Sequence, residues 1–334
     1  MTSVQYYDVL GIGNAIVDVI AQTEEDFLVK HRMQKGTMAL IDEARAAQIY
    51  EAMGPTIESS GGSAANTIVG VASFGARAAF VGKVKKDTLG DVFAHDIRAA
   101  GVAFETRPAA DGPSTARCYV LITPDGERTM NTYLGAAQNL HPRDIDPDVI
   151  ARAGITYLEG YLWDPKDAKE AFVKAAKAAH AANRQVALTL SDAFCVDRYR
   201  AEFLDLMRKG TIDIMFANEG ELKSLYETAD FHAAVGQLRN DCRFAVVTRG
   251  EHGCVVVTAA SVIPVPAFPI DKLVDTTGAG DLFAAGFLVG LARGSDHTMC
   301  GKYAALAAAE VIQHVGARPQ QSLKALAAAN GLRA

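Results

Sequence analysis

Short apolar runs alternate with longer segments of helical spacing along most of this chain. The apolar runs lie at residues 9–13, 78–82, 155–158, 186–190, 212–216 and 244–248, and helical spacing is clear at 64–74, 88–100 and 166–182. Strands that alternate with helices of about ten to fifteen residues form βα units, whose strands pair in parallel. Helices must cover both faces of such a sheet, because its strands are apolar on both sides. The pattern predicts an α/β fold with a doubly wound, mainly parallel sheet.

Two segments interrupt this rhythm. Residues 21–60 mix short apolar runs with a helix near 42–53, and residues 104–134 show alternating strands around a turn at 124–127. We expect these segments to pair as a small β-rich lid over the carboxyl ends of the core strands, where such folds bind ligands. Alternatively, the two segments are unrelated insertions on the surface of the core. The predicted domains are an α/β core of residues 1–20, 61–103 and 135–334 and a lid of residues 21–60 and 104–134.

Composition excludes several classes of function. The 334 residues carry a net charge of −6, which argues against a nucleic-acid or anionic-membrane surface. No apolar stretch approaches the roughly 18 residues of a membrane span, and residues 1–7 lack the regions of a signal peptide. The 5 cysteines are scattered without a CxxC pair, so neither a disulfide framework nor a zinc site is indicated. We expect a cytoplasmic protein with free cysteines.

The run DTTGAGD at residues 275–281 carries the most chemical information in the chain. Gly278 and Gly280 have no Cβ, so their backbone can approach a ligand closely. An apolar stretch of helical length follows, and the free N–H groups of its first turn attract anions. Asp281 suits such a site if it takes a proton from a hydroxyl during phosphoryl transfer. The alternative is an ordinary helix start, with Asp281 as a partner of the helix dipole.

The run GIGNAIVD at residues 11–18 follows the first apolar strand. Asn14 and Asp18 offer an amide and a carboxylate that can hydrogen-bond the vicinal hydroxyls of a sugar. The same run is a weak dinucleotide fingerprint, because Ile16 replaces its third glycine and no helix clearly follows. Turn and cap roles for Asn14 and Asp18 are a third interpretation.

The run GGSAANT at residues 61–67 opens a predicted helix. Gly62 allows close approach to a ligand, and Asn66 lies about one turn inside the helix, where it can face that ligand. The alternative is a glycine-rich linker with Ser63 as the helix N-cap.

Two runs follow later strands. Asn218 and Glu221 lie on one helical face and can orient water around Mg²⁺, although a capping box explains the same spacing. The run at residues 248–253 can place the hydroxyl of Thr248 and backbone amides near nucleotide phosphates.

With these runs in this order, residues 11 to about 317 resemble the ribokinase-like (PfkB) carbohydrate and nucleoside kinases. The resemblance implies a doubly wound core with a β-rich lid, and ATP with Mg²⁺ as cofactors. It makes Asp281 the catalytic base and the amides of Gly278, Ala279 and Gly280 an anion hole. A lid arginine, Arg128, is expected to close on the transferring phosphate.

The same resemblance assigns the donor site. Metal and phosphate contacts fall to Asn218 and Glu221, with the metal held largely through water. The nucleotide is expected to contact Asn218, Thr248, Gly250, Gly253 and Thr277. A monovalent cation such as K⁺ often lies near the strand that carries Asp275 and Thr277, and the sequence leaves open whether one binds here.

Within the family, the acceptor site is similar to that of the adenosine kinases. The spacing of Asn14 and Asp18 and the serine after Gly61-Gly62 carry this similarity. It implies an acceptor site built from Asn14, Asp18, Gly62, Ser63, Asn66, Leu40 and Phe194. Phe194 is the candidate for stacking on the base and Leu40 for covering its other face, although core packing explains both equally well. Asp192 departs from the pattern, because it adds a charge near an apolar base pocket.

We therefore expect an ATP-dependent kinase that phosphorylates the 5′-hydroxyl of a ribonucleoside, most closely adenosine, with Asp281 as the base. A sugar kinase of the same fold, acting on ribose, fructose or a sugar acid, is the nearest alternative. A dinucleotide-dependent oxidoreductase and a non-catalytic ligand sensor are the others. The expected partners are ATP and a small nucleoside or sugar, without nucleic acid or membrane, and the oligomeric state stays open between monomer and homodimer.

Overall fold

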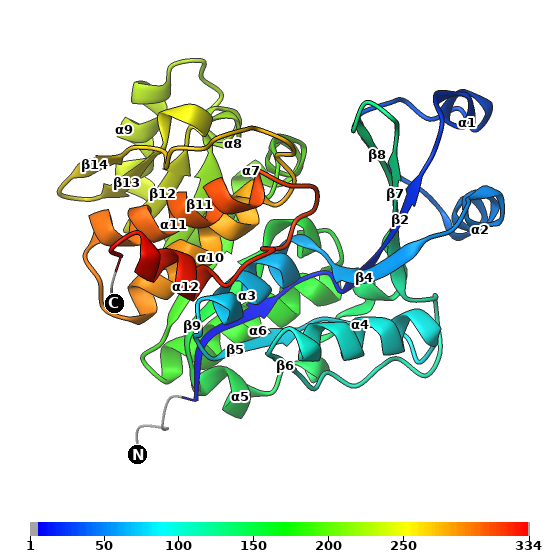
Figure 1. The fold of residues 1–334 in the computed structure, drawn as a ribbon. Helices are drawn as coiled ribbons and strands as arrows, with labels where there is room; N and C mark the ends of the chain where they lie inside the picture. The colour runs from blue at the N-terminus through cyan, green and yellow to red at the C-terminus, as the bar shows by residue number, and fades with distance from the viewer. Residues whose placement is uncertain (1–5, 333–334) are drawn as a thin grey trace.

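The computed structural model describes residues 6–332, which form a large sheet and a small one (Figure 1). The large sheet has the strand order β14-β13-β12-β11-β10-β9-β1-β5-β6, and it is parallel except at β13 and β14. Its strands are β1 (Tyr7–Ile12), β5 (Ala78–Val81), β6 (Val102–Phe104), β9 (Ala153–Glu159), β10 (Gln185–Thr189), β11 (Ile214–Asn218), β12 (Phe244–Thr248), β13 (Cys254–Thr258) and β14 (Val262–Val265). The predicted fold class is confirmed.

Helices cover both faces of this sheet, because alternate strand residues point to opposite sides. Val9 packs in one core, whereas its neighbour Leu10 packs in the other. One face carries α3 (Ser63–Ser73), α4 (Thr88–Ala99), α10 (Ala279–Ala292), α11 (His297–Val311) and α12 (Leu323–Ala329). The other carries α5 (Pro147–Ala151), α6 (Lys166–Ala181), α7 (Ala193–Arg208), α8 (Glu219–Leu225) and α9 (Phe231–Asp241). Short 3₁₀ turns are η1 (Gly135–Asn139), η2 (Pro142–Asp144), η3 (Gly160–Trp163) and η4 (Gly250–His252).

The small sheet stands beside the core, at the right in Figure 1. Its strands run in the order β3-β8-β7-β2-β4. They are β2 (Ile16–Gln22), β3 (Met38–Leu40), β4 (Ile57–Gly61), β7 (Ala116–Ile122) and β8 (Arg128–Tyr133). Helices α1 (Glu25–Lys30) and α2 (Glu43–Ala52) cover its outer face. The two segments expected to pair with each other do so, since β3 pairs directly with β8 and β4 joins the same sheet through β2.

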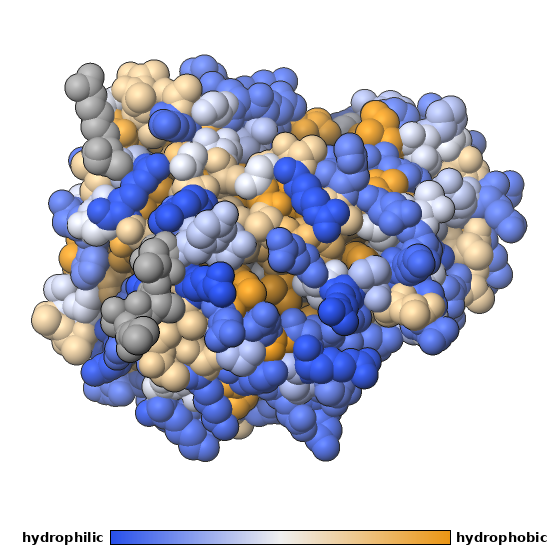
Figure 2. All heavy atoms as spheres, turned by 90° about the horizontal axis from the view of Figure 1, so that it is seen from below, coloured by the Kyte–Doolittle hydropathy of each residue, from blue (hydrophilic) through white to orange (hydrophobic). Residues whose placement is uncertain are grey.

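The division into core and lid stays a prediction, and β2 already begins at Ile16, before the expected boundary. All 5 cysteines are buried and free, as expected. Among residues 6–332, no helix is both long and apolar enough to cross a membrane. Figure 2 shows one face of the molecule, where hydrophilic residues dominate and strongly hydrophobic ones emerge only in small separate areas.

Candidate active site

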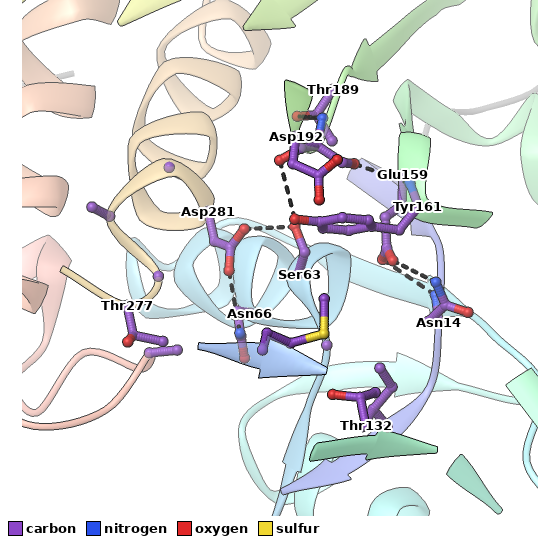
Figure 3. A pocket seen from close by; sticks show the side chains of 18 of the residues that line it. Asn14, Ser63, Asn66, Thr132, Glu159, Tyr161, Thr189, Asp192, Thr277 and Asp281 are labelled. Atoms are coloured by element: carbon purple, nitrogen blue, oxygen red, sulfur yellow. Dashed lines mark hydrogen bonds between the residues drawn. The ribbon is translucent and has the colours of Figure 1, made fainter. Parts of the chain in front are cut away.

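A cavity of about 960 Å³ lies between the carboxyl ends of the core strands and the small sheet. Residues at the ends of successive parallel strands line it, namely Asn14, Glu159, Thr189, Asn218 and Thr248. The first turns of α3 and α10 and the inner face of the small sheet complete the wall (Figure 3). Sheets of this kind bind ligands at this end, so the cavity is the candidate active site.

Asp281 lies in the first turn of α10 and lines this cavity. Its carboxylate accepts hydrogen bonds from Ser63 Oγ at 2.6 Å and from Asn66 Nδ2 at 3.2 Å (Figure 3). Burial raises the pKa of Asp281 to about 6, although these two bonds act to lower it. A carboxylate accepts about four hydrogen bonds, so room remains for a substrate hydroxyl. Ser63 thus binds Asp281 instead of capping α3, whose N-cap is Gly62.

The loop before α10 presents open amides to the cavity. Gly278 has a φ of 79°, and a Cβ there would lie 2.7 Å from the Cα of Ala317, so this position requires glycine. The amide of Ala279 already donates to the carbonyl of Thr276 at 3.1 Å. The amides of Gly278 and Gly280 have no hydrogen-bond partner in residues 6–332. An anion would therefore meet two free donors and the positive end of the helix dipole.

Arg128 and Asp275 form an ion pair beside this loop. Arg128 Nη2 lies 3.1 Å from Asp275 Oδ2, and both side chains are about nine-tenths buried. Asp275 also accepts hydrogen bonds from the amide and hydroxyl of Thr277 and from the amide of Gly316. Because Arg128 begins β8, the small sheet brings a positive charge to the loop of residues 275–280 before α10, which we call the anion loop. The positive group that pairs with Asp275 in the structure is thus the Arg128 guanidinium. Binding of a K⁺ ion near Asp275 and Thr277 stays a prediction.

Asn14 is held by a buried carboxylate that the sequence analysis did not single out. Glu159 accepts from Asn14 Nδ2 at 2.7 Å, from the Asn14 amide at 3.2 Å and from the Ala64 amide at 3.0 Å. The NH₂ group of Asn14 therefore faces Glu159, and its buried Oδ1 has no partner in residues 6–332. A sugar hydroxyl can satisfy such an acceptor. The signal for Glu159 was available, because an acidic residue ends the apolar strand β9.

Asp18 faces the same cavity from β2. Its carboxylate lies against Gly61, where a Cβ would come within 2.3 Å of Oδ2. Burial raises the pKa of Asp18 to about 6, and the positive charges of Arg318 and Arg128 oppose the rise. Gly62 has a φ of 95°, and a Cβ there would meet the Asn14 carbonyl at 2.4 Å. The absence of a side chain at Gly61 and Gly62 thus allows the junction of β4 and α3 to pack closely against Asp18 and Asn14.

Phe194 and Leu40 also line the cavity, and their side chains are 65% and 55% exposed. The core-packing interpretation of these two residues is therefore wrong. The guanidinium of Arg198 stacks on the Phe194 ring at 4.7 Å from its centroid and pairs with Asp164 at 2.8 Å. Asp192 accepts from the Cys195 amide at 2.6 Å as the N-cap of α7, which gives this charge a structural role.

Asn218 and Glu221 form a reciprocal capping box at the start of α8. Glu221 accepts from the Asn218 amide at 3.0 Å and from its side chain at 2.5 Å, and burial raises the pKa of Glu221 to about 7. Both residues line the cavity, as do Thr248 and Thr277. The cavity wall does not include Gly250 in η4 or Gly253 after it, and a Cβ at Gly253 would meet the Val265 carbonyl at 2.1 Å.

The dinucleotide interpretation of residues 11–18 is wrong. In a Rossmann fingerprint the glycine run opens a helix. Here β1 ends at Ile12 and the next element is β2, which begins at Ile16. Gly13 instead packs against Glu159, whose Oε2 would lie 2.2 Å from a Cβ at this position.

Comparison with known proteins agrees with this architecture. Residues 52–324 match the family described as pfkB family carbohydrate kinase. Adenosine kinase from Sinorhizobium meliloti is 54% identical, with a TM-score of 0.90 over 97% of this chain and 99% of that chain. A probable sugar kinase from Rhizobium etli CFN 42 is 51% identical, with a TM-score of 0.92 over 98% and 100%. Adenosine kinase from Saccharomyces cerevisiae is 28% identical over 91% of this chain and 94% of that protein. The chain belongs to the pfkB family of carbohydrate kinases.

Proposed function

We propose that this kinase transfers the γ-phosphoryl group of ATP to the 5′-hydroxyl of adenosine, giving AMP and ADP. The observation that carries the proposal is the placement of Asp281. Its carboxylate meets the first turn of α3 and lies beside the open amides of Gly278 and Gly280, in the cavity that Asn14 also lines. The adenosine kinase from Sinorhizobium meliloti, at 54% identity, supports adenosine as the acceptor.

In the proposed mechanism, Asn14 and Asp18 bind the ribose hydroxyls. The free Oδ1 of Asn14 and the carboxylate of Asp18 are both acceptors, and vicinal hydroxyls are donors. The ribose is thereby oriented with its 5′-hydroxyl toward Asp281. Asp281 accepts the hydroxyl proton as the new O–P bond forms.

The developing negative charge would be stabilised by the helix N-terminus. The free amides of Gly278 and Gly280 act as preorganised donors there, and Arg128 adds a positive charge nearby. Closure of the small sheet over the site would exclude water and so limit hydrolysis of ATP. The predicted cytoplasmic location agrees with an enzyme that consumes ATP.

Mg²⁺ fits the donor end of the cavity. This ion usually keeps several waters and takes one or two carboxylates together with substrate phosphates. Residues 6–332 contain no cluster of three or more potential ligands, but Glu221 supplies one carboxylate at the cavity wall, oriented by Asn218. Glu221 and Asn218 would hold the hydrated ion, which neutralises phosphate charge when bound.

The rate of phosphoryl transfer should fall at acid pH. A general base works only when deprotonated, and burial raises the pKa of Asp281 to about 6. The single-turnover rate should therefore rise as pH increases through about 6 and then level off. A rate that stays constant between pH 5 and 8 would contradict the assignment of Asp281 as the base.

Phe194→Ala should weaken adenosine binding while leaving ATP binding nearly unchanged. Stacking of a base on an aromatic ring contributes about 1–3 kcal/mol, so the KM for adenosine should rise roughly five- to hundredfold. Tyr6→Ala serves as a control, because this exposed aromatic residue lies outside the cavity wall. An unchanged KM for adenosine in Phe194→Ala would remove the residue from the base site.

A panel of acceptors with ATP and Mg²⁺ tests the proposed function. The proposal predicts a kcat/KM for adenosine well above those for inosine, guanosine, ribose and fructose. The main alternative is a sugar kinase, which the probable sugar kinase from Rhizobium etli CFN 42 at 51% identity favours. Preference for a free sugar over every nucleoside would support that alternative and reject ours.

A further inference from the structure

Arg318 lies behind the active site and was not singled out from the sequence. It belongs to an irregular segment between α11 and α12, where no periodic pattern marks it. Its Nε donates to Asn66 Oδ1 at 3.0 Å, and Asn66 Nδ2 in turn donates to Asp281 at 3.2 Å. Arg318, Asn66 and Asp281 thus form a chain of hydrogen bonds that ends on the catalytic base.

We propose that Arg318 is a positioning residue for Asp281, because it holds the Asn66 amide with the NH₂ group toward that carboxylate. The inference rests on the proposed role of Asp281 as the base. A side-chain amide presents an oxygen on one side and NH₂ on the other. A flipped Asn66 would turn its oxygen toward the Asp281 carboxylate and its NH₂ toward the Arg318 guanidinium, so both contacts would become repulsive.

Arg318 is itself held in place by the anion loop. The Gly316 amide donates to Asp275 Oδ2 at 3.0 Å, and Ala317 packs on Gly278. Pro319 follows directly and restricts the backbone of Arg318 to extended conformations. The segment that carries Arg318 is therefore packed against the loop that presents the open amides.

The ion pair that Arg318 forms is a long one. Its nearest ionic partner is Asp96 Oδ2, 3.8 Å from Nη1, and that oxygen already accepts from the amide and hydroxyl of Ser60. Arg318 Nη2 is buried without a hydrogen-bond partner in residues 6–332. The charge of Arg318 thus remains available to the acidic groups of the site, and it lowers the pKa values of both Asp281 and Asp18.

Several polar and titratable groups interact with Asp281. The polar contacts are Ser63 and Asn66 on α3, and Arg318 is the positive charge. The acidic groups that interact with Asp281 are Asp18 on β2, Tyr157 and Glu159 on β9 and Tyr161 in η3. Among these, Asp18 has a similar pKa, so the test must separate the two aspartates.

The test is the pH dependence of the single-turnover rate with ATP and adenosine both saturating. Under these conditions the bound acceptor covers Asp18. The fall of the rate at low pH, which is the acid limb of the pH–rate profile, then reports the pKa of the base in the bound complex. Arg318→Met should slow transfer roughly ten- to hundredfold, the cost of a small misplacement of a catalytic group. It should also move the acid limb to higher pH, because a positive charge near Asp281 is lost.

Arg318→Lys should return the limb toward its wild-type position, since the charge is restored. The matched control is Arg293→Met, because Arg293 ties α10 to α3 at the far end through the Phe74 carbonyl at 2.8 Å. That variant should lower the melting temperature without moving the limb. If Arg318→Met does not fold, Arg318→Gln is measured instead, because its side chain is neutral but can still form hydrogen bonds, and the same shift is expected.

A second readout tests whether Arg318 acts through Asn66. Coupled residues have non-additive effects, so Arg318→Met should slow transfer far less in an Asn66→Ala background than in the wild type. An unmoved acid limb, or fully additive rate losses, would overturn the inference.

The Asp281→Asn variant separates failure of this inference from failure of the proposed function. If Asp281→Asn retains wild-type activity, the assignment of Asp281 as the base is wrong. If Asp281→Asn is inactive while Arg318 variants behave like Arg293→Met, only the role of Arg318 fails.

Discussion

Asp281→Asn should lower the rate of phosphoryl transfer by two to four orders of magnitude, the range expected when a general base is removed. Asparagine has nearly the same shape as aspartate, but its amide cannot accept the hydroxyl proton at neutral pH. Ser63 Oγ can still donate to the remaining oxygen, so the first turns of α3 and α10 should stay together. The measurement is the single-turnover rate with adenosine and ATP.

Binding and folding measurements complete this test. The Kd for ATP should change little, because Asp281 faces the acceptor hydroxyl. The melting temperature should stay close to that of the wild type, since burial of the ionised Asp281 carboxylate is unfavourable, as its raised pKa shows. Activity within tenfold of the wild type in a folded Asp281→Asn variant would contradict its role as the base.

Asp18→Ala should raise the KM for adenosine roughly ten- to a hundredfold, while the KM for ATP stays nearly unchanged. A hydrogen bond to a charged group contributes about 1.5–3 kcal/mol, and this variant removes the carboxylate acceptor for the ribose. The Asp18 side chain makes no hydrogen bond to other residues in the described range 6–332, and burial raises the pKa of its carboxyl group. Its loss should therefore affect binding more than folding.

The loss should also depend on the ribose hydroxyls. With 2′-deoxyadenosine or 3′-deoxyadenosine, the effect of Asp18→Ala should shrink for the sugar that lacks the contacted hydroxyl. Asp42→Ala is the matched control, because Asp42 caps helix α2 beside the small sheet through the Arg45 amide and lies outside the cavity wall. An adenosine KM that responds equally to both variants would indicate a general effect on the small sheet and its helices and reject the ribose contact.

The fold was largely predictable because its elements follow local patterns. Apolar runs such as residues 244–248 form core strands, and the expected hairpin around residues 124–127 joins β7 and β8. Asn218 and Glu221 form the capping box that their spacing allows. Each of these features depends on residues close together in the sequence, where periodicity and capping rules apply.

The missed features depend on contacts between distant residues. The bond from Ser63 to Asp281 joins two helix starts far apart in the chain, whereas the sequence analysis placed Ser63 in the acceptor site, with a helix cap as the alternative. Arg318 reaches Asn66 from a segment without periodicity, so no pattern indicated it. The anion site also offers fewer free amides than expected, because the Ala279 amide donates to the Thr276 carbonyl in a local turn. Phe194 could be placed only when its exposure in the cavity was known.

The position of the transferred phosphate tests the proposed geometry most directly. The enzyme is incubated with ATP, Mg²⁺ and either adenosine or 5′-deoxyadenosine, and the products are identified by ³¹P NMR and mass spectrometry. Our account predicts AMP phosphorylated at the 5′-oxygen, and no phosphorylation of 5′-deoxyadenosine, which should instead inhibit competitively against adenosine. A phosphate on the 2′- or 3′-oxygen, or a phosphorylated product from 5′-deoxyadenosine, would contradict the assignment of Asp281 and its acceptor site.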